Sequence, residues 1–255
     1  MSVKVTVVSA SLSENSSTDQ LGDKIGAAVV EAFRGSGVSV EVVPVRLRGL
    51  AHSIANAMLT NFPDEPLEQA FDAVESADAV IAVTPAYNAS YSGLFKSFFD
   101  VLPEDVLRGT PMILGATGGT PRHSLVIEHE LRPLFMYLHA VAATTGLYVA
   151  TEDWGAHASD SDASSGSNLD RRIARAAREL RALIEMSEPQ LRASEQGAAG
   201  AEAQSEASLN GGAKRSGQSR EIHAARATAG MSADELTKLA PDELYPDFKS
   251  FDQLM

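Results

Sequence analysis

The chain has 255 residues, of which 44% are hydrophobic and 22% charged, and its formal net charge is −13. This balance is typical of a soluble globular protein, and the acidity argues against nucleic-acid binding and disfavours association with anionic membranes. Because there is no cysteine, disulfides, thiolate metal sites and cysteine nucleophiles are excluded. Apolar runs are too short to cross a bilayer, and the first residues lack a signal-peptide pattern. We therefore expect a cytoplasmic protein.

Five apolar segments are predicted as strands, in chain order: Val3 to Ala10, Val38 to Val45, Ala77 to Ala86, Pro111 to Thr117 and Gly146 to Thr151. They lack regular polar alternation, which indicates a parallel sheet covered by helices on both faces.

Helical patterns separate these strands. They cover Asp19 to Phe33, Leu67 to Ser76, a segment from Ser92 to about Leu102, Ser124 to Val141 and Leu169 to Met186. Ser92 is placed to cap the third of these helices, whose Leu94, Phe95, Phe98, Phe99 and Leu102 form one apolar stripe. The alternation predicts an α/β domain with a doubly wound sheet of strand order 2-1-3-4-5.

The composition changes near Ser187, so we divide the chain into a domain, residues 1–187, and a tail, residues 188–255. The tail is rich in Ala, Gly, Ser, Glu and Gln, and this composition predicts disorder. A capping box of Ser232 and Glu235 predicts one short helix within it. The last residues space Tyr245, Phe248, Phe251 and Leu254 three apart. This apolar tip either docks on the domain, a sister subunit or a partner protein, or is a disordered end. The segment from His157 to Asn168 is predicted to be a mobile surface loop.

The predicted strand order places a ligand site beyond the carboxyl ends of the first and third strands. The loop after the first strand, Ser9 to Gln20, contains six hydroxyl residues and leads into a helix. Hydroxyls and free N–H groups at a helix start can hold a phosphate, although an ordinary serine-rich turn has the same composition.

Two further loops follow strands at the same edge. The segment Thr84 to Asp100 (TPAYNASYSGLFKSFFD) offers small polar residues around Tyr87. The segment Thr117 to His123 (TGGTPRH) has two glycines that permit close approach of a ligand. Taken alone, the loop around Tyr87 is equally compatible with a loop that packs one tyrosine, and a plain turn is favoured for the glycine loop. The three loops together favour a site for a phosphate and a planar ring.

The stretch from Thr84 to Gly119 resembles the NAD(P)H-dependent FMN reductases, especially those paired with luciferase-like or alkanesulfonate monooxygenases. The likeness covers roughly Val3 to Asp153 and includes the helix segment HSLVIEHELRPLF from His123 to Phe135. It implies a flavodoxin-like fold, FMN and NAD(P)H as ligands, and a homodimer or homotetramer. It also implies that reduced FMN passes to a partner flavin-dependent monooxygenase.

The resemblance implies a residue set for FMN. The phosphate would bind Ser11, Ser16, Ser17 and Thr18, and the isoalloxazine would lie between Pro85, Ala86, Tyr87 and Asn88 on one side and Thr117, Gly118 and Gly119 on the other. Many relatives have an arginine where this chain has Asn15, so we expect weaker phosphate binding and an exchangeable FMN.

His129 resembles a position where relatives carry a Tyr or His in a π-type turn at the oligomer interface, which implies a role in flavin handling or assembly. The alternative, more common for a lone helical histidine, is surface or interface packing. We predict hydride transfer from nicotinamide C4 to flavin N5, with no catalytic side chain and no metal. The alternatives are a reductase that retains FMN and reduces a quinone, azo dye or metal oxyanion, and a flavodoxin-like electron carrier without NAD(P)H activity.

Overall fold

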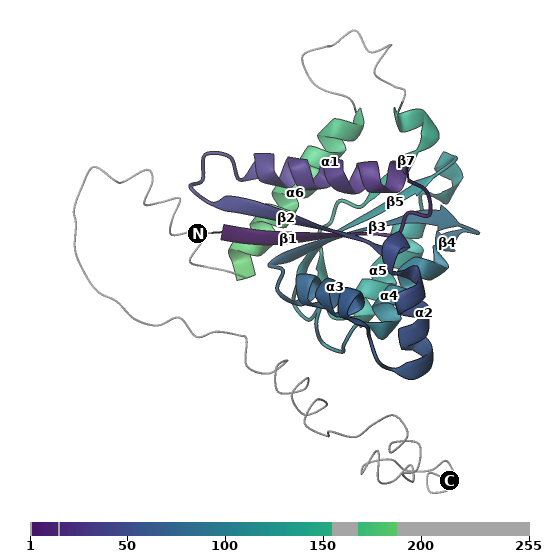
Figure 1. Ribbon diagram of the computed structural model, residues 1–255. Coiled ribbons are helices and arrows are strands. Elements are labelled where there is room, and N and C mark those ends of the chain that lie inside the picture. The colour runs from purple at the N-terminus through teal and green to yellow at the C-terminus, as the bar shows by residue number, and fades with distance from the viewer. Residues whose placement is uncertain (1, 15, 155–167, 188–255) are drawn as a thin grey trace, which may run out of the picture. The chain divides into compact units, whose positions relative to one another are not determined.

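The computed structural model describes residues 2–14, 16–154 and 168–187 (Figure 1). These residues belong to one unit of the chain, Met1–Gln204. The predictions for Asn15, for most of the loop before Asn168 and for the tail lie outside the described residues. No helix in the described ranges is long and apolar enough to cross a membrane.

A parallel sheet forms the centre of the fold, with strand order β2-β1-β3-β5-β6 (Figure 1). Its strands are β1 (Ser2–Ser9), β2 (Ser39–Arg46), β3 (Ala79–Tyr87), β5 (Pro111–Gly118) and β6 (Val141–Ala142). The predicted order 2-1-3-4-5 is therefore confirmed, with β5 as the fourth predicted strand. The fifth is divided in two: β6 pairs with the start of β5, and β7 (Leu147–Ala150) pairs with its end. The two-residue strand β4 (Ser90–Tyr91) forms an antiparallel hairpin with β3.

Helices cover both faces of the sheet (Figure 1). On one face lie α1 (Ser17–Ala32) and α6 (Asn168–Ser187), whose buried side chains join one apolar core with inward residues of β1, β3 and β5. The other face is covered by α2 (Ala51–Thr60), α3 (Glu65–Glu75), α4 (Gly93–Val101) and α5 (Arg132–Tyr137). The helix α2 was not predicted.

The core beneath α4 is aromatic. Phe95 and Phe98 are fully buried, and the rings of Phe95, Phe99 and Phe135 stack edge to face at centroid distances of 4.8 to 6.0 Å. The predicted cap is confirmed, because the Ser92 hydroxyl accepts a hydrogen bond from the Phe95 N–H at 3.2 Å. The start of α4 also packs against the hairpin, since the centroid of the Phe95 ring lies 6.0 Å from that of the Tyr91 ring of β4.

The single helix predicted from Ser124 to Val141 is wrong. A 3₁₀ turn (Pro121–His123) precedes the segment, which itself contains a π-helical turn (Ile127–Leu131) and then α5, and Val141 already belongs to β6. Pro133 lacks an N–H and cannot donate to the carbonyl of His129, so a regular α-helix cannot continue through this turn. After α5, His139 adopts a left-handed conformation with φ of 59°, which reverses the chain into β6.

Candidate functional site

Three loops meet where the parallel strands β1, β3 and β5 end, which we call the carboxyl edge (Figure 1). The strand register brings them level, since Ser9 pairs with Val83 and Pro85 pairs with Thr117. The Ala10 N–H donates to the Val83 carbonyl at 3.0 Å, which holds the first loop beside β3. The residues predicted from the three loops are thus brought to one edge of the sheet.

Most of the predicted hydroxyl groups of the first loop already form hydrogen bonds with other residues of this chain. The Ser16 side chain caps α1 by accepting from the Thr18 N–H at 3.1 Å. Thr18 is buried, and its hydroxyl lies 2.7 Å from that of Thr117, so these two predicted site residues contact each other directly. Ser11 is buried and donates its hydroxyl proton to Asp19 at 2.6 Å. Ser17, in contrast, is exposed at the start of α1.

The Asp19 carboxylate, in the first turn of α1, holds the first loop in place through hydrogen bonds. Asp19 accepts hydrogen bonds from the hydroxyls of Ser9 and Ser11, and Arg46 at the end of β2 lies 3.4 Å from the same carboxylate. Arg46 also donates to the Ser9 hydroxyl at 3.0 Å and pairs with Asp23 one turn further along α1. We call Ser9, Ser11, Asp19 and Arg46 the Asp19 cluster. This cluster has no local signal in the sequence, because Ser9 and Arg46 are brought together only by the pairing of β1 with β2.

The second loop is a tight hairpin between β3 and β4. Asn88 and Ala89 form its turn with φ angles of 50° and 67°, the backbone of a two-residue hairpin turn. Pro85 is buried beside Thr117, Ala86 is half-buried, and the Tyr87 side chain is 47% exposed. Tyr87 and Asn88 therefore extend past the sheet as an accessible aromatic and amide surface. The Ser90 hydroxyl donates to Glu130 at 2.8 Å and ties this hairpin to the π-helical turn.

The third loop combines an open glycine with an unpartnered hydroxyl. A Cβ placed on Gly119 would meet no protein atom within 4 Å, whereas one on Gly118 would lie 2.1 Å from the Tyr148 hydroxyl oxygen. Tyr148 donates that hydroxyl to the Thr120 carbonyl at 2.6 Å. Its pKa is raised above the usual value by burial and by the nearby Asp153 carboxylate. The Thr120 Oγ1 atom is buried and has no hydrogen-bond partner among the described residues.

Thr120 and Tyr148 are site features that the sequence analysis missed. Thr120 directly follows the predicted glycines, but its unpartnered hydroxyl becomes evident only from the fold. A buried polar atom without a partner costs about 1–3 kcal/mol, so a ligand group that bonds Thr120 Oγ1 would recover that energy. The open space at Gly119 and the exposed face of Tyr87 suit a planar ring, and the start of α1 suits a phosphate. These residues fit FMN.

Side-chain hydrogen bonds from Arg132 hold the π-helical turn next to the carboxyl edge. Arg132 donates to Glu128 at 2.7 Å and to the Ala143 carbonyl at 3.2 Å. The hydrogen bond from Arg132 holds the pKa of Glu128 below its ordinary value. His129 lies in this turn and is exposed, so the π-type geometry implied by the resemblance is present. Its role in assembly stays a prediction.

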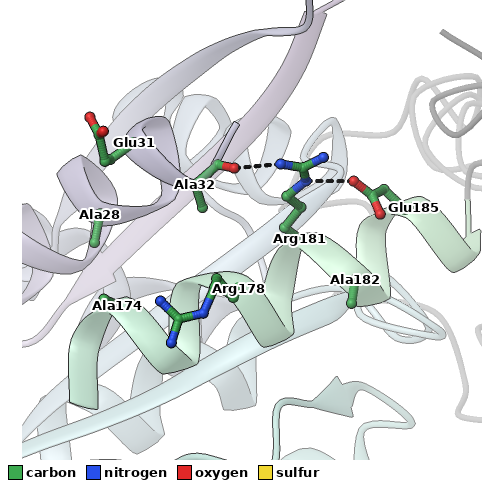
Figure 2. A pocket seen from close by; sticks show the side chains of 8 residues that line it. All are labelled: Ala28, Glu31, Ala32, Ala174, Arg178, Arg181, Ala182 and Glu185. Carbon is green, nitrogen blue, oxygen red and sulfur yellow. Dashed lines mark hydrogen bonds and ion pairs between the residues drawn. The ribbon is translucent and has the colours of Figure 1, made fainter. Parts of the chain in front are cut away.

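Among the described residues, no three His, Cys, Asp or Glu side chains are grouped so that they could hold a metal ion. Figure 2 shows a depression between α1 and α6, lined by Ala28, Ala32, Ala174 and Ala182 and by four charged residues. One of these, Arg181, donates to the Ala32 carbonyl at 2.7 Å and to Glu185. This depression contains none of the residues of the three loops.

Comparison with known proteins covers the same region. The sequence pattern of the family described as NADPH-dependent FMN reductase matches residues 3–155. The NADH-dependent FMN reductase SfnF of Pseudomonas putida is 37% identical over 155 residues, which cover 61% of this chain and 81% of that protein. An FMN reductase (NADPH) of Pseudomonas aeruginosa is 35% identical over 120 residues, 47% of this chain and 64% of that protein.

Solved structures agree on the fold. An oxidoreductase from Corynebacterium diphtheriae superposes with a TM-score of 0.67 at 41% identity, covering 72% of this chain and 97% of that chain. An NADH:FMN oxidoreductase in its apo form superposes with a TM-score of 0.58 at 26% identity, covering 74% of this chain and 94% of that chain.

Proposed function

The chain belongs to the NADPH-dependent FMN reductase family, and on that basis we propose that it reduces FMN at the carboxyl edge and releases it to a flavin-dependent monooxygenase. One observation carries the proposal. The family match, residues 3–155, contains all three loops, and these loops converge on an open surface with an unpartnered buried hydroxyl.

In this proposal, the protein supplies position and environment. The start of α1 with Ser17 and its neighbours holds the phosphate, and the helix dipole favours its negative charge. Pro85, Ala86, Tyr87 and Asn88 contact one part of the ring system. Thr117, Gly118 and Gly119 contact another, with Thr120 Oγ1 available as a hydrogen-bond partner for a polar ring atom. When bound, FMN would supply the redox chemistry of the reaction, as the acceptor of a hydride from the nicotinamide.

No side chain needs to act as an acid, base or nucleophile in this scheme. The residues of the three loops hold the ring at an accessible edge, where the nicotinamide can stack against it. The exposed position of Tyr87 and Gly119 supports that access.

Exchange of FMN is supported by the charges around the first loop. Two arginines of the described residues approach it, and both are paired with carboxylates: Arg46 with Asp19 and Asp23, and Arg48 with Glu14. A phosphate at the start of α1 therefore relies on N–H groups and hydroxyls. Such a site holds FMN less firmly than one with an arginine fork.

The test uses the purified full-length chain. Its flavin absorbance is recorded, and NADH and NADPH oxidation is followed with and without added FMN. The proposal expects little bound flavin and a rate that depends on added FMN. A coupled assay with a flavin-dependent monooxygenase then tests delivery. Flavin-loaded protein that does not oxidise NAD(P)H would overturn the proposal, and FMN-independent reduction of a quinone would overturn its exchange step.

A further inference from the structure

We propose that Asp19 weakens the binding of the FMN phosphate and that Arg46 limits this weakening, so that this pair sets how readily FMN exchanges. The inference rests on the proposed function, because it takes the phosphate to lie at the start of α1. Asp19 is in the first turn of this helix, and its side chain is 20% exposed.

The charges around the start of α1 disfavour a phosphate. Glu14, Asp19 and Asp23 lie around the first loop and the start of α1, whereas the cations that pair with them are Arg46 and Arg48. This group is therefore net negative before a ligand arrives. A phosphate monoester adds about 1.5 to 2 negative charges near neutral pH. The partial positive charge at the helix start, about half a unit, offsets only part of the repulsion.

The proton of the Ser11 hydroxyl is used in a hydrogen bond to Asp19. An ionised carboxylate can only accept hydrogen bonds, so Ser11 must donate its single proton to Asp19, at 2.6 Å. The same holds for Ser9. While Ser11 donates to the Asp19 carboxylate, it has no proton left to donate to a phosphate. Asp19 thus opposes the phosphate both by its charge and by occupying a hydroxyl donor that faces the loop.

Arg46 acts in the opposite direction. Its guanidinium lies 3.4 Å from the Asp19 carboxylate and 3.0 Å from the Ser9 hydroxyl, and its side chain is 33% exposed. It neutralises much of the Asp19 charge without being free to bind a phosphate itself. Both residues are positioning residues, because they act through Ser9, Ser11 and the local field.

This arrangement predicts an effect on the phosphate and none on the ring. Riboflavin carries the same isoalloxazine as FMN but has no phosphate, so it reports the ring contacts alone. The ratio of the two dissociation constants therefore separates a change at the phosphate from a general loss of structure.

The experiment compares Asp19→Asn with wild type in the full-length protein, by fluorescence titration with FMN and with riboflavin. Asparagine keeps the shape, can still accept a hydrogen bond, and can donate to Ser11 so that the serine proton is released. We expect the Kd for FMN to fall about three- to tenfold, which corresponds to one like charge removed and one donor gained. The Kd for riboflavin should stay within about twofold.

Two further variants make the result specific. Asp23→Asn removes a charge that also pairs with Arg46 but lies one turn along α1 and is 62% exposed, so its effect on FMN should be clearly smaller. Arg46→Gln should raise the Kd for FMN several-fold and leave riboflavin unchanged. In the Asp19→Asn background, Arg46→Gln should raise the Kd for FMN much less than it does in the wild-type background.

The outcomes separate this inference from the proposed function. The role of Asp19 would be overturned, and the proposed function left standing, by any of three results. Asp19→Asn could change the Kd values for FMN and riboflavin equally, could change neither, or could have the same effect on FMN as Asp23→Asn. Wild-type protein that binds neither flavin would overturn the proposed function and this inference with it. Urea unfolding of each variant identifies any that fail to fold, and Arg46→Gln tests the same pair in the opposite direction.

Discussion

Replacing Gly118 with alanine tests how the third loop is braced. The new Cβ would lie 2.1 Å from the Tyr148 hydroxyl oxygen and 3.1 Å from its Cζ. Since ordinary contacts begin near 3.4 Å, the tyrosine ring must move, and its 2.6 Å hydrogen bond to the Thr120 carbonyl is lost. We therefore expect Gly118→Ala to lower the free energy of unfolding by about 1–3 kcal/mol, a range that includes the loss of this hydrogen bond.

The Tyr148→Phe variant provides the matched background. It removes the hydroxyl and costs about 1 kcal/mol for the hydrogen bond. In that background the nearest atom to the alanine Cβ is the ring carbon at 3.1 Å, so the added cost of Gly118→Ala should fall below about 1 kcal/mol. The double-mutant cycle should therefore show a coupling of roughly 1–2 kcal/mol.

The assay is urea unfolding followed by circular dichroism, with the KM for FMN measured in parallel. Gly119→Ala is the control, because its Cβ meets no protein atom. It should leave the free energy of unfolding within about 0.5 kcal/mol of wild type. It should nevertheless raise the KM for FMN, since the proposed ring occupies that space. Equal penalties for Gly118→Ala in both backgrounds, or none in either, would refute the reasoning.

Three further predictions follow from single contacts. Ala89→Gly should raise the free energy of unfolding by about 1 kcal/mol in urea titrations, because Ala89 has a φ of 67° and glycine adopts this conformation without strain; no gain would contradict a left-handed turn. Phe95→Ala should cost about 3–5 kcal/mol in the same assay, because the ring is fully buried among other aromatic rings; a loss under 1 kcal/mol would place the ring outside the core. Burial raises the pKa of Glu179, but hydrogen bonds from Thr145 and Arg175 outweigh it and leave the pKa below its ordinary value. Glu179 therefore stabilises the fold at pH values above its unfolded pKa, and this stabilisation is lost as the pH falls through the lower pKa of the folded state. Glu179→Gln should flatten that acid-side loss in thermal unfolding measured across pH, and an unchanged pH profile would count against it.

Much of the fold could be predicted from local patterns. The uninterrupted apolar runs of β1 and β3 predict buried parallel strands, and Ser92 before the aromatic stripe predicts the start of α4. The helix α2 was missed because only Ile54 and Ala57 are buried along it, while Met58 and Leu59 are exposed. Without a clear apolar stripe, there is no periodic pattern to detect.

The location of the site could also be predicted, because parallel strands must end at one edge. The hydrogen-bond partners of its side chains could not be predicted. Ser11, Ser16 and Thr18 are equivalent as hydroxyls in the sequence, yet their partners come from Asp19, from the helix backbone and from Thr117, 99 residues away. Such long-range pairings depend on the packed fold and have no local signal.

The central claim is that FMN binds at the carboxyl edge, and a crystal structure of the protein with FMN tests it most directly. We expect density for the ring beside Gly119 and Tyr87, within hydrogen-bond reach of Thr120 Oγ1, and for the phosphate at the start of α1. Density for FMN elsewhere, such as in the depression between α1 and α6 (Figure 2), would contradict it.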